Sequence, residues 1–269
     1  MKNIILFLAT LIKEVQEDEL IPAANELTYK IILALFPFII FLLTLIGYME
    51  LDTSLFMNKL YQGLPAELAE IFSVFVKEVL AVKRPSLLST SLIFTLFSAS
   101  SGFNSVMRGI HKAYGIKDSR FFLKQRAVSM ILVLLFALLI ALSMVMLVFN
   151  NHIYVLLTKY LPESEAFKYI FSFMGYFVTI LFMLSGVMLI NKLALSKKTS
   201  FKSLLPGGLF TVILWLIASG GFNMYVSNFS RYSAVYGSLA GIILLMVWLN
   251  IISTVLLLGS EINAMLEVK

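Results

Sequence analysis

Cysteine is absent from this sequence of 269 residues, and charged residues make up only 13% of it. Without cysteine, the chain has no disulfide framework, no thiolate nucleophile and no zinc site of the cysteine type. A soluble domain carries about 25% charged residues, so this chain has too few to cover a water-facing surface. Hydrophobic residues make up 60% of the sequence, and we infer that lipid is its main solvent.

The usual signatures of catalysis and nucleotide binding are missing as well. The sequence has no Walker loop, no glycine fingerprint of a dinucleotide-binding fold and no HExxH zinc motif. Its two histidines, His111 and His152, fall in loops that we predict on opposite sides of the membrane, so they cannot bind one metal ion. No base is placed to activate a serine. We therefore predict no enzyme activity, no metal site and no cofactor.

Long uncharged stretches make up most of what is present. A helix needs ~20 apolar residues to cross the bilayer. Six stretches meet this length without any Asp, Glu, Lys or Arg: Ile31–Met49, Ser86–Met107, Ala127–Phe149, Tyr169–Asn191, Ser203–Ser230 and Tyr232–Ser260. We predict an all-α bundle of six membrane-spanning helices, in which residues 1–269 form a single membrane domain.

The positions of Lys and Arg predict the orientation of these spans. Basic residues are enriched in cytoplasmic loops, and an even number of spans places both termini on one side. We predict a cell-membrane protein with both termini in the cytoplasm, although the first outside loop, Glu50–Pro85, also carries basic residues. The two loops that decide the prediction contain Arg108, Lys112, Lys117, Arg120, Lys124 and Arg126, and Lys192, Lys197, Lys198 and Lys202.

Two further segments have apolar residues at helical spacing. Residues 1–20 begin with a short apolar run that resembles a signal peptide, but no small-residue cleavage site follows it. We predict an amphipathic helix at the cytoplasmic interface. The outside loop, residues 50–85, contains a second amphipathic pattern. It indicates another interfacial helix, or one that covers an outer cavity.

Charged residues at the ends of the spans are the first candidates for a functional site. Glu26 and Lys30 are four residues apart and share a helix face, Arg108 ends the second span, and Glu261 ends the sixth. We predict that these four residues form a charge cluster that closes the cytoplasmic end of a central cavity. The alternative is that each is an ordinary interfacial charge whose side chain reaches water.

Polar and small residues inside the spans are further candidates. Each unsatisfied polar group at membrane depth costs on the order of several kcal/mol, so such a group needs a hydrogen-bond partner or a solvated cavity. We predict cavity-lining roles for Asn104, Asn223, Tyr236 and Asn250. Small residues allow helix backbones to approach closely, and we predict such packing for Ser98, Gly102, Gly237 and Gly241.

Three ordered blocks of the sequence resemble the YihY/BrkB family of bacterial inner-membrane proteins, once labelled ribonuclease BN. The resemblance covers nearly the whole chain from residue 24 to 265, and it implies six spans with cytoplasmic ends. Lys30 departs from the family pattern, which has an uncharged residue there. The blocks are Ala24–Tyr29 with Leu35–Phe38, Ser98–Phe103 with Tyr114, Gly115 and Arg120, and Pro206–Gly208 through Trp215, Tyr225, Tyr232, Tyr236–Ser238 and Trp248 to Gly259–Ala264.

Three classes of function remain open at the level of the sequence. The first is a transporter or flippase-like protein for a small or amphiphilic, anionic substrate, without an ATP site of its own. The second is a non-transporting protein that organises lipids or an envelope complex. The third, from the old family label, is a nuclease, which needs convergent metal-binding groups that the sequence does not supply. The net charge of +6 could suggest nucleic acid, but in a membrane protein the positions of the basic residues matter more. The basic loops that we predict in the cytoplasm suggest anionic lipid as a partner, and we expect no nucleic-acid partner; the oligomeric state is left open.

Overall fold

The computed structural model describes residues 2–48, 85–158, 165–227 and 239–267, and these residues form helices joined by short turns, with no strand among them. The helices are α1 (Lys2–Glu17), α2 (Leu20–Tyr48), α5 (Pro85–Ala113), α6 (Phe122–Thr158), α7 (Glu165–Ala194), α8 (Phe201–Ser227) and α10 (Leu239–Glu267).

Six of these helices, α2, α5, α6, α7, α8 and α10, are long and apolar enough to cross a membrane. The predicted six-span, all-α fold is therefore confirmed. Helices satisfy their own backbone hydrogen bonds, which lipid cannot do for them. The helix that we predicted in the outside loop falls in residues 49–84, which lie outside the described residues.

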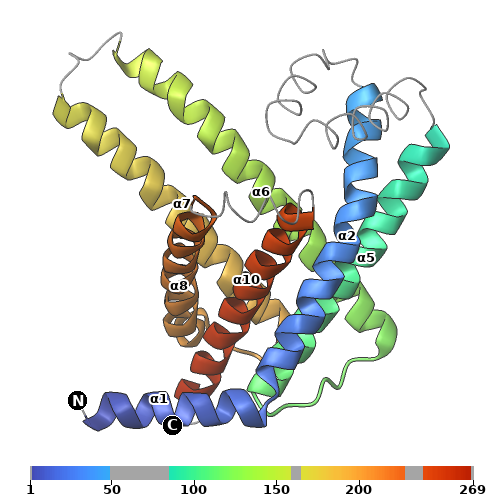
Figure 1. The fold of residues 1–269 in the computed structure, drawn as a ribbon, viewed down its shortest axis with the longest axis vertical. Helices are drawn as coiled ribbons and strands as arrows, with labels where there is room; N and C mark the ends of the chain where they lie inside the picture. The colour runs from blue at the N-terminus through green and yellow to red at the C-terminus, as the bar shows by residue number, and fades with distance from the viewer. Residues whose placement is uncertain (1, 49–84, 159–164, 228–238, 268–269) are drawn as a thin grey trace.

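The N-terminal helix α1 lies across one end of the bundle, roughly perpendicular to the spans (Figure 1). It is separated from α2 by Asp18 and Glu19, and Glu19 adopts a φ of 49°. This left-handed conformation is uncommon for a residue with a side chain, and here it turns the chain from α1 into α2. A helix is thus present where the sequence predicts one, and its location in the membrane interface stays a prediction.

Helix α10 occupies the middle of the bundle, where it packs against α1, α2, α5 and α8. The long helix pair α2 and α5 forms one side of the bundle, and α6 and α7 diverge from that pair at the end opposite α1 (Figure 1). The packed core lies at the α1 end, where the helices converge. It consists of Leu20, Ala24, Leu27, Val106, Met107, Ile110, Leu132, Ile190, Ala194, Leu195, Leu204 and Leu257.

Helices α8 and α10 meet backbone to backbone. A Cβ atom at Gly207 would lie 1.9 Å from the carbonyl oxygen of Gly259, and one at Gly259 would lie 1.8 Å from the hydroxyl of Thr211. The Gly207 N–H donates to Oδ1 of Asn263 at 2.7 Å, and Nδ2 of Asn263 donates to the Leu204 carbonyl at 3.1 Å. The asparagine therefore joins α10 to the first turns of α8, beside Pro206.

The loop between α5 and α6 is fixed to the end of α7 by Arg120. One guanidinium nitrogen of Arg120 donates to the carbonyls of Leu193 and Ala194, at 3.2 and 2.8 Å, and the side chain also pairs with Asp118 at 3.7 Å. The last carbonyls of a helix have no intrahelical donor, so Arg120 satisfies groups that would otherwise be left without partners. Both loops that the sequence predicts to be cytoplasmic consequently lie at the same end of the bundle.

Candidate functional site

Glu26 of α2 is the centre of a charged cluster with α5. Oε1 of Glu26 accepts hydrogen bonds from Lys30 Nζ at 2.7 Å, from the Ser105 hydroxyl at 3.2 Å and from the Arg108 guanidinium. Ser105 also accepts from Lys30 at 2.7 Å and from Arg108 at 3.1 Å. We call Glu26, Lys30, Ser105 and Arg108 the α2–α5 cluster.

Local sequence explains why these residues meet. Glu26 and Lys30 are one helical turn apart on α2, and Ser105 and Arg108 are nearly one turn apart on α5. Gly102 lies one turn before Ser105, and a Cβ atom there would be 3.9 Å from that of Lys30. This is an ordinary van der Waals distance, so a methyl group would fit at position 102, and Gly102 lies directly at the contact of α5 with Lys30.

The α2–α5 cluster carries more positive than negative charge. Two cations share a single carboxylate, so the described side chains sum to one net positive charge. The rest of the protein leaves 43% of the Glu26 side chain, 20% of the Lys30 side chain and 50% of the Arg108 side chain uncovered. The cluster is therefore accessible from the surroundings of the helices at the α1 end, and it is not enclosed in a central cavity.

Glu261 does not join these residues, contrary to the four-residue cluster that we predicted. It is 1% exposed near the end of α10, and no described contact links it to Glu26, Lys30 or Arg108. Instead, a carboxylate oxygen of Glu261 lies within 4.8 Å of those of Glu14 and Asp18. The reason is that the end of α10 reaches α1, which crosses the bundle there.

Asn250 is the predicted cavity residue with the most defined partners. Its Nδ2 donates to Oδ1 of Asn25 at 2.7 Å and is 3.4 Å from the hydroxyl of Thr28. Thr28 in turn donates to Ser253 at 3.3 Å. These bonds join α2 to α10, so Asn250 has a packing role in the structure. Asn104 is half-buried, Asn223 is exposed, and Tyr236 lies outside the described residues.

The residues that we predicted for close helix packing differ in their surroundings. Gly102 is buried between α2 and α5, and Ser98 is half-buried. Gly241 is exposed, and a Cβ atom there would meet no described atom within 4 Å; Gly237 lies outside the described residues. The sequence analysis missed the packing roles of Gly207 and Gly259. The small residues Gly207 and Thr211, four apart on α8, are the signal that could have indicated this contact.

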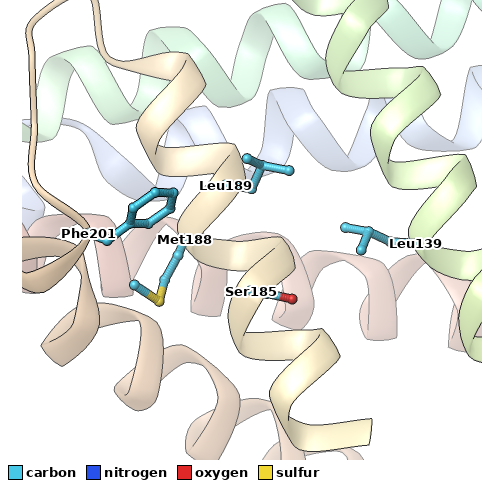
Figure 2. A pocket seen from close by; sticks show the side chains of 5 residues that line it. All are labelled: Leu139, Ser185, Met188, Leu189 and Phe201. Carbon is cyan, nitrogen blue, oxygen red and sulfur yellow. The ribbon is translucent and has the colours of Figure 1, made fainter. Parts of the chain in front are cut away.

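A cavity of about 440 Å³ lies between α6, α7 and α8 (Figure 2). Its lining is apolar except for one hydroxyl, and the residues are Leu139, Ser185, Met188, Leu189 and Phe201. None of the charged or amide residues that we predicted for a solvated pocket lines this cavity. Its chemistry suits a hydrocarbon chain better than an ion.

The two carboxyl groups in the turn between α1 and α2 have shifted pKa values. Lys112 donates to Glu19 at 2.5 Å and thereby lowers the pKa of this exposed carboxyl. The pKa of Asp18 is raised, first by burial and then by the neighbouring carboxyls of Glu14 and Glu17.

Among the described residues, Glu14, Asp18 and Glu261 are the group that could hold a metal ion. Sequence analysis does not reveal this group, because Glu261 is distant in the sequence.

Comparison with known proteins agrees with the architecture. The model of the family described as virulence factor BrkB matches residues 11–269. The ribonuclease-like protein YfkH of Bacillus subtilis (strain 168) is 34% identical over 242 residues, which are 90% of this chain and 88% of that protein.

Membrane proteins of the UPF0761 group match over a shorter region. One from Pseudoalteromonas translucida is 37% identical over 79 residues, which cover 29% of this chain and 26% of that protein. One from Tolumonas auensis is 36% identical over 83 residues, which cover 31% and 28% of the two chains. No solved structure matches the chain. From the family match over nearly its whole length, together with six helices able to span a membrane, this chain belongs to the virulence factor BrkB family of membrane proteins.

Proposed function

We propose that this protein binds the anionic headgroup of an amphiphile at the α2–α5 cluster and moves that amphiphile across the membrane without an ATP site of its own. The observation that carries the proposal is the sharing of one carboxylate, Glu26, by two cations, Lys30 and Arg108. The remaining positive charge and the exposure of Arg108 leave the cluster able to accept a second anion.

The chemistry of Arg108 favours a phosphate or carboxylate ligand. Guanidinium groups bind such anions through paired, charge-assisted hydrogen bonds. In the free protein, Glu26 provides the negative charge that an incoming headgroup would supply. Exchange of Glu26 for the headgroup would leave Lys30 still bonded to Ser105 at 2.7 Å. The cluster thus has two arrangements available, one closed on Glu26 and one open to a ligand.

The location of the cluster supports an amphiphile as the ligand. Glu26 lies near the start of α2 and Arg108 near the end of α5, so both are close to the ends of the spans. We infer that this end faces the cytoplasm, where anionic lipids attract each basic residue by ~1 kcal/mol. The apolar cavity between α6, α7 and α8 is a suitable environment for a hydrocarbon tail, although no residue of the cluster lines it.

Transfer of fluorescent lipids in proteoliposomes tests the proposal. The full-length protein is expected to accelerate the movement of a fluorescent phosphatidylglycerol between leaflets, measured by chemical quenching of the outer leaflet. Arg108→Ala is expected to reduce the rate roughly tenfold, which is ~1.4 kcal/mol in the barrier. Glu26→Ala is expected to alter the rate as well, and the double variant should differ from the product of the single effects because the two residues are in contact.

Arg126→Ala is the matched control for the loss of a basic side chain. Arg126 lies in the first turns of α6, where it stacks 4.1 Å from the centroid of the Phe97 ring and donates to the Phe97 carbonyl. It belongs to no contact of the α2–α5 cluster, so its removal should leave lipid transfer unchanged. Equal rates in the wild type, Arg108→Ala and protein-free liposomes would refute the transport proposal.

A non-transporting role in organising lipids or an envelope complex is the second candidate. It is favoured by the apolar lining of the cavity and by the packed core at the α1 end. Binding of phosphatidylglycerol that depends on Arg108, without any accelerated transfer, would support this role over transport.

The name of YfkH mentions ribonuclease, and nuclease activity is the third alternative. Glu26 and Glu261, the pair that sequence analysis considered for such a role, are not in contact in the described structure. Hydrolysis of RNA by the pure protein that disappears in the Glu26→Ala and Glu261→Ala double variant would support this alternative.

A further inference from the structure

Two carboxylates from the N-terminal segment and one from α10 converge where α1 meets the end of α10. Glu14 is on α1, Asp18 is in the turn before α2, and Glu261 is near the end of α10. Each offers an oxygen, and these oxygens all lie within 4.8 Å of one another. We call Glu14, Asp18 and Glu261 the acidic triad.

Glu261 is the member that requires an explanation. Its side chain is 1% exposed, and its Oε2 has no hydrogen-bond partner among the residues that the structure describes. A buried carboxylate that lacks partners costs on the order of several kcal/mol in a medium of low dielectric constant. Two neighbouring carboxylates add repulsion to this cost. A proton on one carboxyl or a group with positive charge would remove this cost.

The protein does not supply this charge from the residues that the structure describes. None of their Lys or Arg side chains forms an ion pair with Glu14, Asp18 or Glu261. The positive charge of Lys112 acts against the rise in the pKa of Asp18, but the Lys112 ammonium group is bonded to Glu19 at 2.5 Å. Either a bound proton or a bound cation therefore has to offset the negative charge of the triad.

We propose that the acidic triad is a binding site for a divalent cation of the Mg²⁺, Mn²⁺ or Ca²⁺ class, and that the cation fastens α1 to the end of α10. The ligands are all carboxylate oxygens, which hard cations prefer, whereas Zn²⁺ sites usually include histidine or cysteine. Oxygens on opposite sides of such a cation are roughly 4–5 Å apart. The spacing within the triad fits this geometry.

The cation has a structural consequence for the whole α1 end. Glu261 lies two residues before Asn263, which bonds to the first turns of α8, and Asp18 lies in the turn that leads into α2. A cation shared by these carboxylates would link α1, α2 and α10 at the end where the core is packed. This inference does not depend on the proposed lipid transport, because the triad and the α2–α5 cluster share no residue.

Direct binding of Mn²⁺ tests the site. The full-length protein, first treated with a chelator, is reconstituted in an uncharged maltoside detergent, so that no lipid phosphate competes for the ion. Loss of the free Mn²⁺ signal in electron paramagnetic resonance should show one saturable site, from which Mg²⁺ or Ca²⁺ displaces Mn²⁺. Glu261→Gln and Asp18→Asn should each weaken Mn²⁺ binding by roughly tenfold or more, as loss of a ligand is at least as severe as loss of a supporting group.

Glu267→Gln is the matched control. Glu267 is an exposed carboxylate of α10, the helix that carries Glu261; it pairs with Lys197 at 3.1 Å and is not part of the triad. This variant should bind Mn²⁺ as the wild type does. In addition, Mg²⁺ should protect the backbone amides of α1 against hydrogen exchange in the wild type and in Glu267→Gln, but not in Glu261→Gln.

Several results would overturn the proposal. One is the absence of saturable Mn²⁺ binding in the wild-type protein, which would mean that Glu261 is neutralised by a proton instead. Another is unchanged affinity in Glu261→Gln and Asp18→Asn. If the change at buried Glu261 prevents folding, Glu14→Gln at a half-buried position provides the same comparison. The wild-type measurement decides the question independently of any variant.

Discussion

Gly259 of α10 lies so close to α8 that a Cβ atom there would stand 1.8 Å from the Thr211 hydroxyl oxygen and 2.6 Å from the Gly207 carbonyl oxygen. Neither helix has room for even one methyl group at this contact. Close approach of this kind is the main source of van der Waals attraction between helices in lipid, where burial from water contributes little.

Gly259→Ala is therefore expected to destabilise the fold by about 2–3 kcal/mol, because the two backbones must separate. Gly207→Ala should have a similar effect. Thermal unfolding in detergent measures both changes. Gly220→Ala, also on α8, is the control, since a Cβ atom there would meet no atom of the described residues within 4 Å. A Gly259→Ala protein as stable as Gly220→Ala would show that α8 and α10 do not pack as described.

Arg120→Ala should detach the α5–α6 loop from the end of α7. The change removes the donor to two terminal carbonyls and leaves the nearly buried carboxylate of Asp118 without its arginine partner. We expect a loss of about 2–3 kcal/mol, or a decrease of roughly 5–10 °C in Tm.

Lys117→Ala, in the same loop, is the control for Arg120→Ala, because Lys117 is exposed and its removal should leave the Tm unchanged. Equal melting temperatures for the two variants would contradict the capping role of Arg120.

Asn191 and Ser260 form a buried hydrogen bond between α7 and α10, with the serine donating at 2.8 Å. A double-mutant cycle with Asn191→Ala and Ser260→Ala should give a coupling energy of about 0.6 kcal/mol, and at most ~1.7, as for other hydrogen bonds within membranes. Measurements of unfolding in mixed micelles supply the four free energies. Strict additivity would indicate that the two side chains are not bonded in the membrane.

The orientation of the bundle can be tested with single cysteines, since the native chain has none. We expect cysteines at positions 117 and 198 to be protected from a membrane-impermeant thiol reagent in intact cells and to react after the cells are opened. The structure brings these loops together, because Lys197 lies 4.7 Å from the centroid of the Tyr114 ring. Labelling of either position from outside would contradict the predicted orientation and indicate the inverted one. Positions 77 and 159, which we expect outside, lie beyond the described residues.

Much of the α2–α5 cluster could be anticipated from local sequence. The spacing of Glu26 and Lys30 places them one helical turn apart in any helix. Arg108 ends the second span, and this end lies on the same side of the membrane as the start of the first span. Ser105 was missed because a serine in a span usually bonds to its own helix. Only the contact of α2 with α5 shows that its hydroxyl lies between the three charges.

Composition and periodicity determined that this chain spans a membrane and how many helices do so, because lipid demands long uncharged helices whatever their arrangement. The tertiary structure alone decided the partner of Glu261. At the end of α10 that carboxylate could have met Arg108 or the acidic side chains of α1, and no local pattern distinguishes these outcomes. The crossing of α1 beneath α10 places Glu261 beside Glu14 and Asp18, since side-chain neighbours across helices depend on packing angles and not on spacing along one chain.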